Sequence, residues 1–371
     1  MTGLSVARCL RRLGVADVIV VDAGTPGQEA TVRSSGGFRR QFATAIEINL
    51  STLSLPFFDE VFASADFSGG MQRLGYAFLA GEGDIRSLSA AWVLQRKMGV
   101  PSEWLEPADI RARFPYLETD GLRGGTFSAE DGFVDPWSVH QWLLRDCRRS
   151  GVTILEDERV IAMDAIRGRI ATVRTELRTF EPSIVINAGG AWSRLVSRLG
   201  GSDLEVDPSP RVKLVTNRHP QLPTDMPLIT DMDTGVYVRS EGGAAMIGVK
   251  PPHRAISFEI DTSAELISWM AERATVRFPS LADAGLAHLV TGLYEVTPDG
   301  LPIAGRDNRV ENLFVISGFN GHGIMHGPAL ARALAELIVL GRPTDLDLDA
   351  LSPGRFAGIS GATAHGHRDL L

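Results

Sequence analysis

The hydrophobic pattern changes period along the chain, and at three places a short apolar run adjoins a helical repeat. Residues 18–21 form an apolar run after a helical pattern over residues 1–14. A second run at 183–187 precedes a glycine-containing turn and a helix, and a third at 313–316 precedes a long helix over about 323–340. Alternating strands and helices are the units of a parallel sheet. These segments therefore predict a Rossmann-like α/β core.

Between these units, the pattern predicts antiparallel strands and isolated helices. Strands are expected within 72–86, 152–176 and 227–260, and helices over 46–63, from about 87, from 107, over 136–149 and over 262–277. This layout predicts a discontinuous nucleotide-binding domain into which an α+β substrate domain with an antiparallel sheet is inserted twice. The expected boundaries are 1–75, 138–205 and 298–371 for the first domain, and 76–137 and 206–297 for the second.

The first residues match the second half of a glycine-rich dinucleotide loop. In a Gly-x-Gly-x-x-Gly fingerprint, the last glycine lets the helix pack close to the sheet, and an acidic residue about 20 positions later binds the ribose. Gly3 and Asp22 stand at these two places. The alternative is an ordinary amphipathic helix followed by a strand. Because the fingerprint's first strand and first two glycines are missing, we expect either a true start upstream of Met1 or a degraded gene.

Composition narrows the class of protein. The formal net charge of −8 argues against non-specific binding to nucleic acid. Cys9 and Cys147 have no metal or redox spacing, so no metal site is expected, and buried thiols suggest a reducing cytoplasm. The sequence shows neither the pattern of a signal peptide nor an apolar run of membrane-spanning length. A cytoplasmic protein without a membrane span is therefore expected.

The C-terminal part contains a strand, a glycine-rich turn and a helix start. Residues 291–305 read TGLYEVTPDGLPIAG, and residues 317–328 read SGFNGHGIMHGP. Free backbone N–H groups and the positive end of the helix dipole make such a turn an anion site. A flavin ring that gains an electron pair needs such a partial positive charge near its N1–C2=O edge. The alternative is a tight turn before a core helix, with His322 as a simple cap.

Five segments in order resemble the glycine, sarcosine and D-amino-acid oxidase family of FAD enzymes. They are Gly3 with Asp22, residues 34–42 (SSGGFRRQF), residues 187–192 (NAGGAW), residues 294–305 and residues 318–323. The resemblance covers nearly the whole chain, and it is closest to the branch similar to the sarcosine oxidase beta subunit. It implies a discontinuous Rossmann-like FAD-binding domain and the oxidation of a small amino acid or amine.

The resemblance also implies roles for particular residues. Gly3 and Asp22 would hold the pyrophosphate and the adenosine ribose, and the loop from Ser34 to Gly37 would pass along the ribityl chain and the flavin ring. The full set expected at FAD is Gly3, Asp22, Ser34, Ser35, Gly36, Gly37, Val160, Ala188, Gly189, Trp192, Gly292, Gly318, Asn320, Gly321, His322, Gly323, Ile324 and Met325. The set expected to be catalytic is Arg39, Arg40, Tyr294 and His322.

Family members move a hydride from the carbon beside the substrate nitrogen to flavin N5, and no strong base is needed if the amine binds deprotonated. A substrate carboxylate would need a cation, and arginine suits it because its guanidinium binds both oxygens. Arg39 or Arg40 is expected in this role, with Arg239 as a weaker candidate. The alternative for Arg39 and Arg40 is a solvated or flavin-facing pair. Tyr294 matches an active-site tyrosine, and Tyr237 is a weaker candidate; either could instead be a core residue.

Three departures from the family matter. Members that attach FAD through a cysteine carry it where Gly292 stands, so we expect non-covalent FAD. The lysine that helps oxygen react in monomeric sarcosine oxidases aligns with Met246, and a second flavin-edge lysine aligns with Met325. Slow reaction with oxygen, and a separate electron-acceptor protein or partner subunit, are therefore expected.

Two other classes stay open on the sequence alone. One is an NAD-dependent dehydrogenase with a Rossmann domain, which the C-terminal turn argues against. The other is a non-catalytic or FAD-deficient truncated product, which the missing first strand supports.

Overall fold

The computed structural model describes residues 1–251, 253 and 255–357. Its α-helices are α1 Thr2–Arg12, α2 Ala45–Ala63, α3 Ile85–Lys97, α4 Pro107–Arg113, α5 Pro136–Arg149, α6 Ser193–Leu199, α7 Ala264–Arg277 and α8 Gly323–Leu340. Its strands up to residue 200 are β1 Ile19–Val21, β2 Gly37–Phe38, β3 Met71–Gln72, β4 Tyr76–Ala80, β5 Glu103–Leu105, β6 Gly124–Ser128, β7 Gly132–Val134, β8 Thr153–Leu155, β9 Val160–Ile166, β10 Arg169–Thr175, β11 Thr179–Phe180 and β12 Val185–Asn187. The later strands are β13 Asp207–Arg218, β14 Leu228–Asp231, β15 Val236–Glu241, β16 Ala244–Val249, β17 Leu286–Val296, β18 Ile303–Arg306 and β19 Leu313–Ser317.

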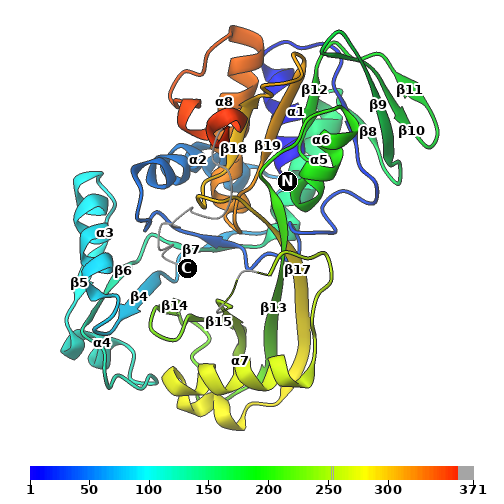
Figure 1. Ribbon diagram of the computed structural model, residues 1–371. Coiled ribbons are helices and arrows are strands. Elements are labelled where there is room, and N and C mark those ends of the chain that lie inside the picture. The colour runs from blue at the N-terminus through cyan, green and yellow to red at the C-terminus, as the bar shows by residue number, and fades with distance from the viewer. Residues whose placement is uncertain (252, 254, 358–371) are drawn as a thin grey trace.

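One half of the molecule is the predicted Rossmann-like part (Figure 1). Its parallel pairs are β1 with β8, and β12 with β19; β18 adds to β19 in the antiparallel sense. These strands form two separate small sheets within the described residues. Helices α1, α2, α5 and α8 pack on one another beside the strands and enclose the largest apolar core. Whether a further strand precedes Gly3 stays a prediction.

Helix α8 lies at the centre of this core. It is the one helix in the described part of the chain with the length and apolar composition of a membrane span, and 67% of that span is buried inside the protein. It packs against α1 and α2, and the backbone N–H of Ala329 donates to the hydroxyl of Ser54 on α2 at 3.1 Å. Burial of this kind is typical of a core helix, so composition alone does not indicate a membrane span.

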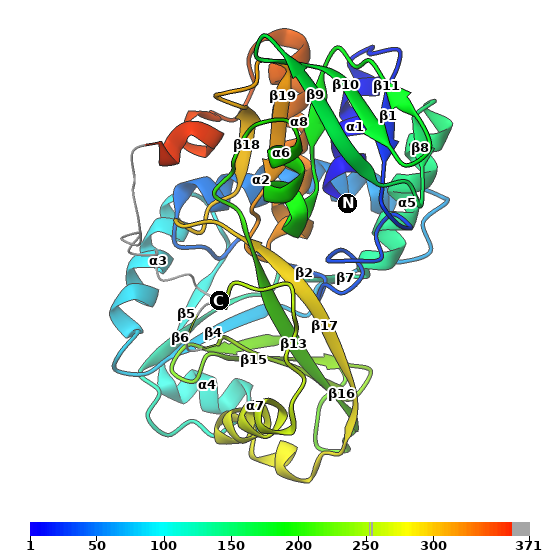
Figure 2. The same cartoon turned by 45° about the vertical axis from the view of Figure 1, so that its right-hand side comes forward.

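The other half is built on one eight-stranded sheet, in the order β17-β13-β16-β15-β14-β4-β6-β5. All pairs are antiparallel except β14 with β4. Helix α7 packs on β16, β15 and β13, and α3 and α4 pack near β6. Figure 2 shows β13 and β17 running upward from this sheet towards the Rossmann-like half. Residues at the upper end of these two strands are therefore placed between the halves.

The predicted helices form where the sequence places them, because their N-terminal caps are present. Thr44 accepts a hydrogen bond from the N–H of Glu47 and begins α2, and Asp135 accepts from the N–H groups of Trp137 and Ser138 and begins α5. The expectation of paired strands over 152–176 is only partly right. β9 and β10 form a hairpin, whereas β8 is not part of it and pairs in parallel with β1. Of the predicted range 298–371, residues 358–371 lie outside the described part.

Candidate active site

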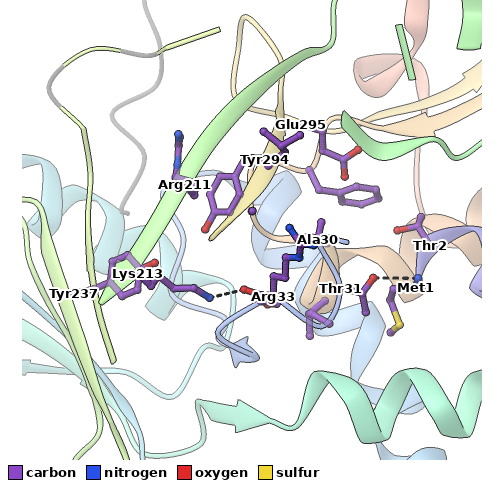
Figure 3. A pocket seen from close by; sticks show the side chains of 17 residues that line it. Met1, Thr2, Ala30, Thr31, Arg33, Arg211, Lys213, Tyr237, Tyr294 and Glu295 are labelled. Atoms are coloured by element: carbon purple, nitrogen blue, oxygen red, sulfur yellow. Dashed lines mark hydrogen bonds between the residues drawn. The ribbon is translucent and has the colours of Figure 1, made fainter. Parts of the chain in front are cut away.

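A pocket lies where the two halves meet (Figure 3). The free space in it, including its open mouth, is about 750 Å³. The loop after β1, the strands β13, β15 and β17, and the start of α8 all contribute to its wall. The lining residues are Met1, Thr2, Ala30, Thr31, Arg33, Ser34, Arg211, Lys213, Tyr237, Gly292, Leu293, Tyr294, Glu295, Phe319, Gly321, Gly323 and Ile324.

Six of the expected site residues line this pocket. They are Ser34, Gly292, Tyr294, Gly321, Gly323 and Ile324. The other expected residues are not part of the lining, and they are Gly3, Asp22, Ser35, Gly36, Gly37, Arg39, Arg40, Val160, Ala188, Gly189, Trp192, Gly318, Asn320, His322 and Met325. The structure thus brings together the flavin-ring part of the prediction more closely than the adenosine part.

The N-terminal end of α1, where the first N–H groups of a helix lack partners within the helix, lies at the pocket, since Met1 and Thr2 are lining residues. Gly3 lies against the turn after β12, where a Cβ on Gly3 would be 3.4 Å from Cβ of Ala188. Asp22 follows β1, its carboxylate accepts from the N–H of Gly24 at 3.1 Å, and burial raises its pKa. The roles of Gly3 and Asp22 at a dinucleotide stay predictions.

The loop from Ser34 to Gly37 needs its glycines. Gly36 has φ of +68°, and a Cβ there would lie 2.0 Å from the carbonyl oxygen of Val134. Gly37 begins β2, and a Cβ there would lie 2.4 Å from the hydroxyl oxygen of Tyr76. The backbone therefore comes close to β7 and β4. Of the four residues of this loop, Ser34 lines the pocket.

The side chain of Asn320 holds the glycine-rich turn before α8 in place through hydrogen bonds. Its side-chain amide donates to the Thr297 hydroxyl at 3.1 Å and to the carbonyl oxygens of Gly300 and Gly318 at 2.9 and 2.7 Å. Asn320 itself has φ of +51°. Gly321 lies against the ring of Tyr294, where a Cβ would be only 2.4 Å away. Asn320 therefore shapes the turn, while Gly321 and Gly323 face the pocket.

His322 occupies the N-cap position of α8 but its side chain makes no capping hydrogen bond. Its Nε2 lies 3.3 Å from the guanidinium of Arg39, and burial and the charge of Arg39 hold its pKa well below the usual range. A neutral imidazole beside a cation is thus the form present at neutral pH. The reading of His322 as a simple cap does not fit this contact.

The three arginines expected near substrate have different surroundings. Arg39 is buried, and its guanidinium lies 4.5 and 4.9 Å from the ring centres of Phe42 and Phe78. Arg40 forms an ion pair with Glu130, whose side chain is largely exposed. Arg239 forms an ion pair with Glu241 at the end of β15. None of the three lines the pocket.

Sequence reasoning missed two cations on β13. Arg211 and Lys213 are two residues apart on a strand, so both project to the same face, and both line the pocket. Arg211 lies over the ring of Tyr294, 4.6 Å from its centre. The alternation Arg-x-Lys within an apolar strand pattern was the signal that could have identified them.

Glu295 was also missed. Its side chain accepts a hydrogen bond from the Ser317 hydroxyl at 2.7 Å and from the N–H groups of Gly318 and Phe319, and burial raises its pKa. It therefore ties β17 to the turn before α8. The sequence pattern around residue 295 does not indicate this contact, which depends on how the end of β17 lies against the turn before α8.

The remaining expected residues have structural partners. The N–H of Gly189 donates to the side chain of Asn187 at 3.0 Å, and Trp192 stacks on Phe258 with ring centres 5.8 Å apart. Val160 begins β9, and Met325 is buried in the core on α8. Gly292 faces the loop, where a Cβ would be 3.5 Å from Cβ of Arg33.

A family model described as FAD dependent oxidoreductase matches residues 1–337. The chain is 29% identical to FAD-dependent oxidoreductase domain-containing protein 1 of Xenopus laevis, over 95% of this chain and 80% of that protein. It is 27% identical to mitochondrial sarcosine dehydrogenase of Mus musculus, over 74% of this chain but only 31% of that protein. It therefore corresponds to one part of that longer relative.

Solved structures share the fold. L-proline dehydrogenase from P. horikoshii superposes with a TM-score of 0.88 at 23% identity, over 96% of this chain and 95% of that chain. Glycine oxidase from Geobacillus kaustophilus gives a TM-score of 0.83 at 22% identity, over 95% of this chain and 96% of that one. The expected fold class, enzyme class and FAD cofactor are confirmed, and FAD replaces the NAD alternative. The chain belongs to the FAD dependent oxidoreductase family.

Proposed function

We propose that the protein oxidises a small primary or secondary amino acid or amine. A hydride would pass from the carbon beside the substrate nitrogen to N5 of FAD, and water would hydrolyse the resulting imine. Names of similar proteins support this class of substrate: they include sarcosine dehydrogenase, 4-methylaminobutanoate oxidase and L-proline dehydrogenase. All three names refer to an amino acid whose nitrogen carries a second carbon substituent.

One observation carries the proposal. Two basic side chains of β13, Arg211 and Lys213, and the rings of Tyr237 and Tyr294 line the same pocket as Ser34 of the glycine loop. The guanidinium of Arg211 offers a binding site for a carboxylate, and aromatic rings exclude water from the reacting carbon. A small amino acid bound here would be held between charged and aromatic groups.

The residues of the pocket and of the loops next to it fit FAD. The first turn of α1 would hold the pyrophosphate, and Asp22 the ribose. The close-packed backbone of Gly36 and Gly37 would lie beside the ring, and the N–H groups at Gly321 and Gly323 would face its pyrimidine edge. When bound, FAD accepts the two electrons and the hydrogen that leave the substrate. All other parts of the reaction fall to this chain's own residues.

Two finer points belong to the same proposal. An arginine, either Arg39 or the pocket-lining Arg211, would bind the substrate carboxylate through two parallel hydrogen bonds. The electrons would leave through an acceptor other than oxygen, which could be a protein in the cytoplasm or a partner subunit.

Anaerobic titration of the FAD-loaded protein tests the proposal. Sarcosine, dimethylglycine, glycine, L-proline and 4-methylaminobutanoate are added in turn, and the visible absorption of oxidised flavin is followed. We expect at least one of them to bleach the flavin. A protein that binds FAD but is bleached by none of these compounds, while dithionite bleaches it fully, contradicts the proposed substrate class and favours a non-catalytic protein.

A further inference from the structure

Lys213 is a buried lysine without a carboxylate partner. Its side chain belongs to a residue only 7% exposed, and no carboxylate lies within ion-pair distance of it in the described part of the chain. Its Nζ instead donates to the carbonyl oxygen of Arg33 at 2.5 Å and to the hydroxyl of Ser35 at 3.1 Å. Figure 3 shows the side chain reaching from β13 across to the Arg33 loop. A lysine placed this way has lost water without gaining a counter-ion.

The surrounding groups favour the neutral amine. Burial is the main cause that lowers the pKa of Lys213, to about 7, and Arg239 lowers it further, while Glu241 acts in the opposite direction. Glu241 is already paired with Arg239 on β15. Arg211 on the same strand, and Arg33 and the terminal amine of Met1 on the facing side, add positive charge to the pocket wall. Of the other titratable groups in the wall, Tyr237 and Tyr294 are phenols, and the carboxylate of Glu295 accepts hydrogen bonds from Ser317 and from the turn before α8.

Neutral Lys213 has a free electron pair. As an amine it keeps two N–H bonds, which match its two hydrogen-bond acceptors, Arg33 and Ser35. The electron pair is then left for a third partner within the pocket that Lys213 lines. Tyr237 completes this side of the site, because it shares a hydrogen bond with Ser35. Lys213 is thus held by two hydrogen-bond acceptors, and the lone pair of its neutral Nζ remains able to accept a proton.

We propose that Lys213 is the base that accepts the proton of the substrate ammonium group. This rests on the proposed function, since hydride can leave the carbon only when the neighbouring nitrogen has a free electron pair. The N–H bond of the ammonium breaks, the proton bonds to Nζ, and the electron pair stays on the substrate nitrogen. That pair forms the C=N bond as the hydride leaves to FAD, so the substrate loses two electrons. Lys213 returns its proton to water afterwards. The substrate class is therefore an amine that is protonated at neutral pH.

The first test measures the lysine directly and does not depend on turnover. The chain contains three lysines, Lys97, Lys213 and Lys250, and the other two are exposed. Lysine labelled with ¹³C at Cε gives one signal for each, and Lys213→Met identifies the signal of interest. We expect it to titrate with a midpoint near 7 in the FAD-loaded protein. A midpoint near the ordinary lysine value of about 10.4 overturns the proposal.

The second test is the rate of flavin reduction by whichever of the five compounds bleaches the flavin. In the unmodified protein, the second-order rate should rise with pH to a plateau above pH 7. Lys213→Met and Lys213→Arg should both lose about 100-fold or more at pH 7, because neither side chain can accept a proton there. Both variants should recover steadily towards the pKa of the substrate amine, with no inflection near 7. Lys97→Met, which removes an exposed lysine on α3, should behave like the unmodified protein.

A carboxylate anchor would behave differently. If Lys213→Arg retains the rate and only Lys213→Met loses it, Lys213 acts through its charge and the proposal fails. Unchanged pH profiles in both variants have the same consequence. If no compound bleaches the flavin, the proposed function fails, whereas the titration of the Cε signal still decides the state of Lys213.

Discussion

The guanidinium of Arg39 lies 3.3 Å from Nε2 of His322, directly behind the turn that begins α8. Arg39 also packs against Phe42, Tyr76 and Phe78, so its charge is held in an aromatic enclosure. A buried cation at this position raises the positive potential on the inner side of the turn. It therefore supports binding of negative charge, whether on the flavin edge or on a substrate carboxylate.

Replacing Arg39 should separate these two roles. We expect Arg39→Ala to raise KM for sarcosine far more than KM for dimethylamine, which lacks the carboxylate, because losing one partner of a partly buried charge pair typically costs about 2–5 kcal/mol. Arg40→Ala should have the smaller effect, since Arg40 is paired with Glu130 at the surface. Steady-state kinetics with a dye acceptor measures both. Equal changes for the two substrates would show that Arg39 supports the flavin or the turn instead.

The buried His326 should make the protein less stable in acid. Burial, and then the charge of Arg39, lower the pKa of His326 to about 3, while the unfolded chain has the ordinary value of about 6.5. Between these values the unfolded state binds more protons, so stability is lost as pH falls below about 6.5, by at most about 1.4 kcal/mol per pH unit. His326→Leu should flatten the dependence of Tm on pH between 6.5 and 4.5.

The control is His288→Leu, which changes an exposed histidine on β17. It should leave the slope of Tm against pH as in the unmodified protein. An unchanged slope in His326→Leu would show that the buried imidazole does not couple folding to protons.

Oxygen should be a poor electron acceptor. Met246 on β16 packs with Val215, Ala244 and Val290, and Met325 is buried in the main core, so neither supplies a charge that could stabilise superoxide. A missing preorganised charge commonly costs about 3 kcal/mol in the barrier, or about 100-fold in rate. Substrate-reduced flavin should reoxidise slowly in air and quickly with a dye, in stopped-flow absorbance. Met246→Lys should raise the oxygen rate relative to Met246→Leu; equal rates for air and dye would contradict the idea.

FAD should be held without a covalent bond. Gly292 has no side chain, and residues 34–41 contain neither cysteine nor histidine. Acid precipitation should therefore leave the yellow colour in the supernatant, as its absorption spectrum will show. Colour that stays with the precipitated protein would require another attachment residue.

Local signals were enough to predict much of the fold. The caps at Thr44 and Asp135 define the starts of α2 and α5, and the apolar run at residues 313–316 defines β19. The parallel partner of β1 could not be predicted, because β8 comes more than 130 residues later and only the tertiary packing selects it over the β9–β10 hairpin. Strand pairing over such a distance leaves no periodic trace in the sequence.

Some residues of the candidate site could also be predicted from the sequence, and others could not. Glycine positions could be predicted from a motif, because Gly36 and Gly321 are required by backbone geometry that only glycine tolerates. The alternation of Arg211 and Lys213 indicates that they share one face of a strand, but such a charged pair is usually on a solvated face, so the pattern alone does not place them in the pocket. The burial of Lys213 follows from the position of β13 between β16 and β17, which brings this side chain to the Arg33 loop.

The structure of β13 also affects how the substrate preference of such a protein can change. Its hydrogen bonds to β16 and β17 are made by the backbone, so the sheet does not depend on which side chains stand at 211 and 213. Point mutations at these two places would alter the polarity and basicity of the pocket while the large sheet keeps its backbone pairing. Within the family, substrate preference could therefore change towards larger, more acidic or less basic amines by substitutions at only two positions of this strand.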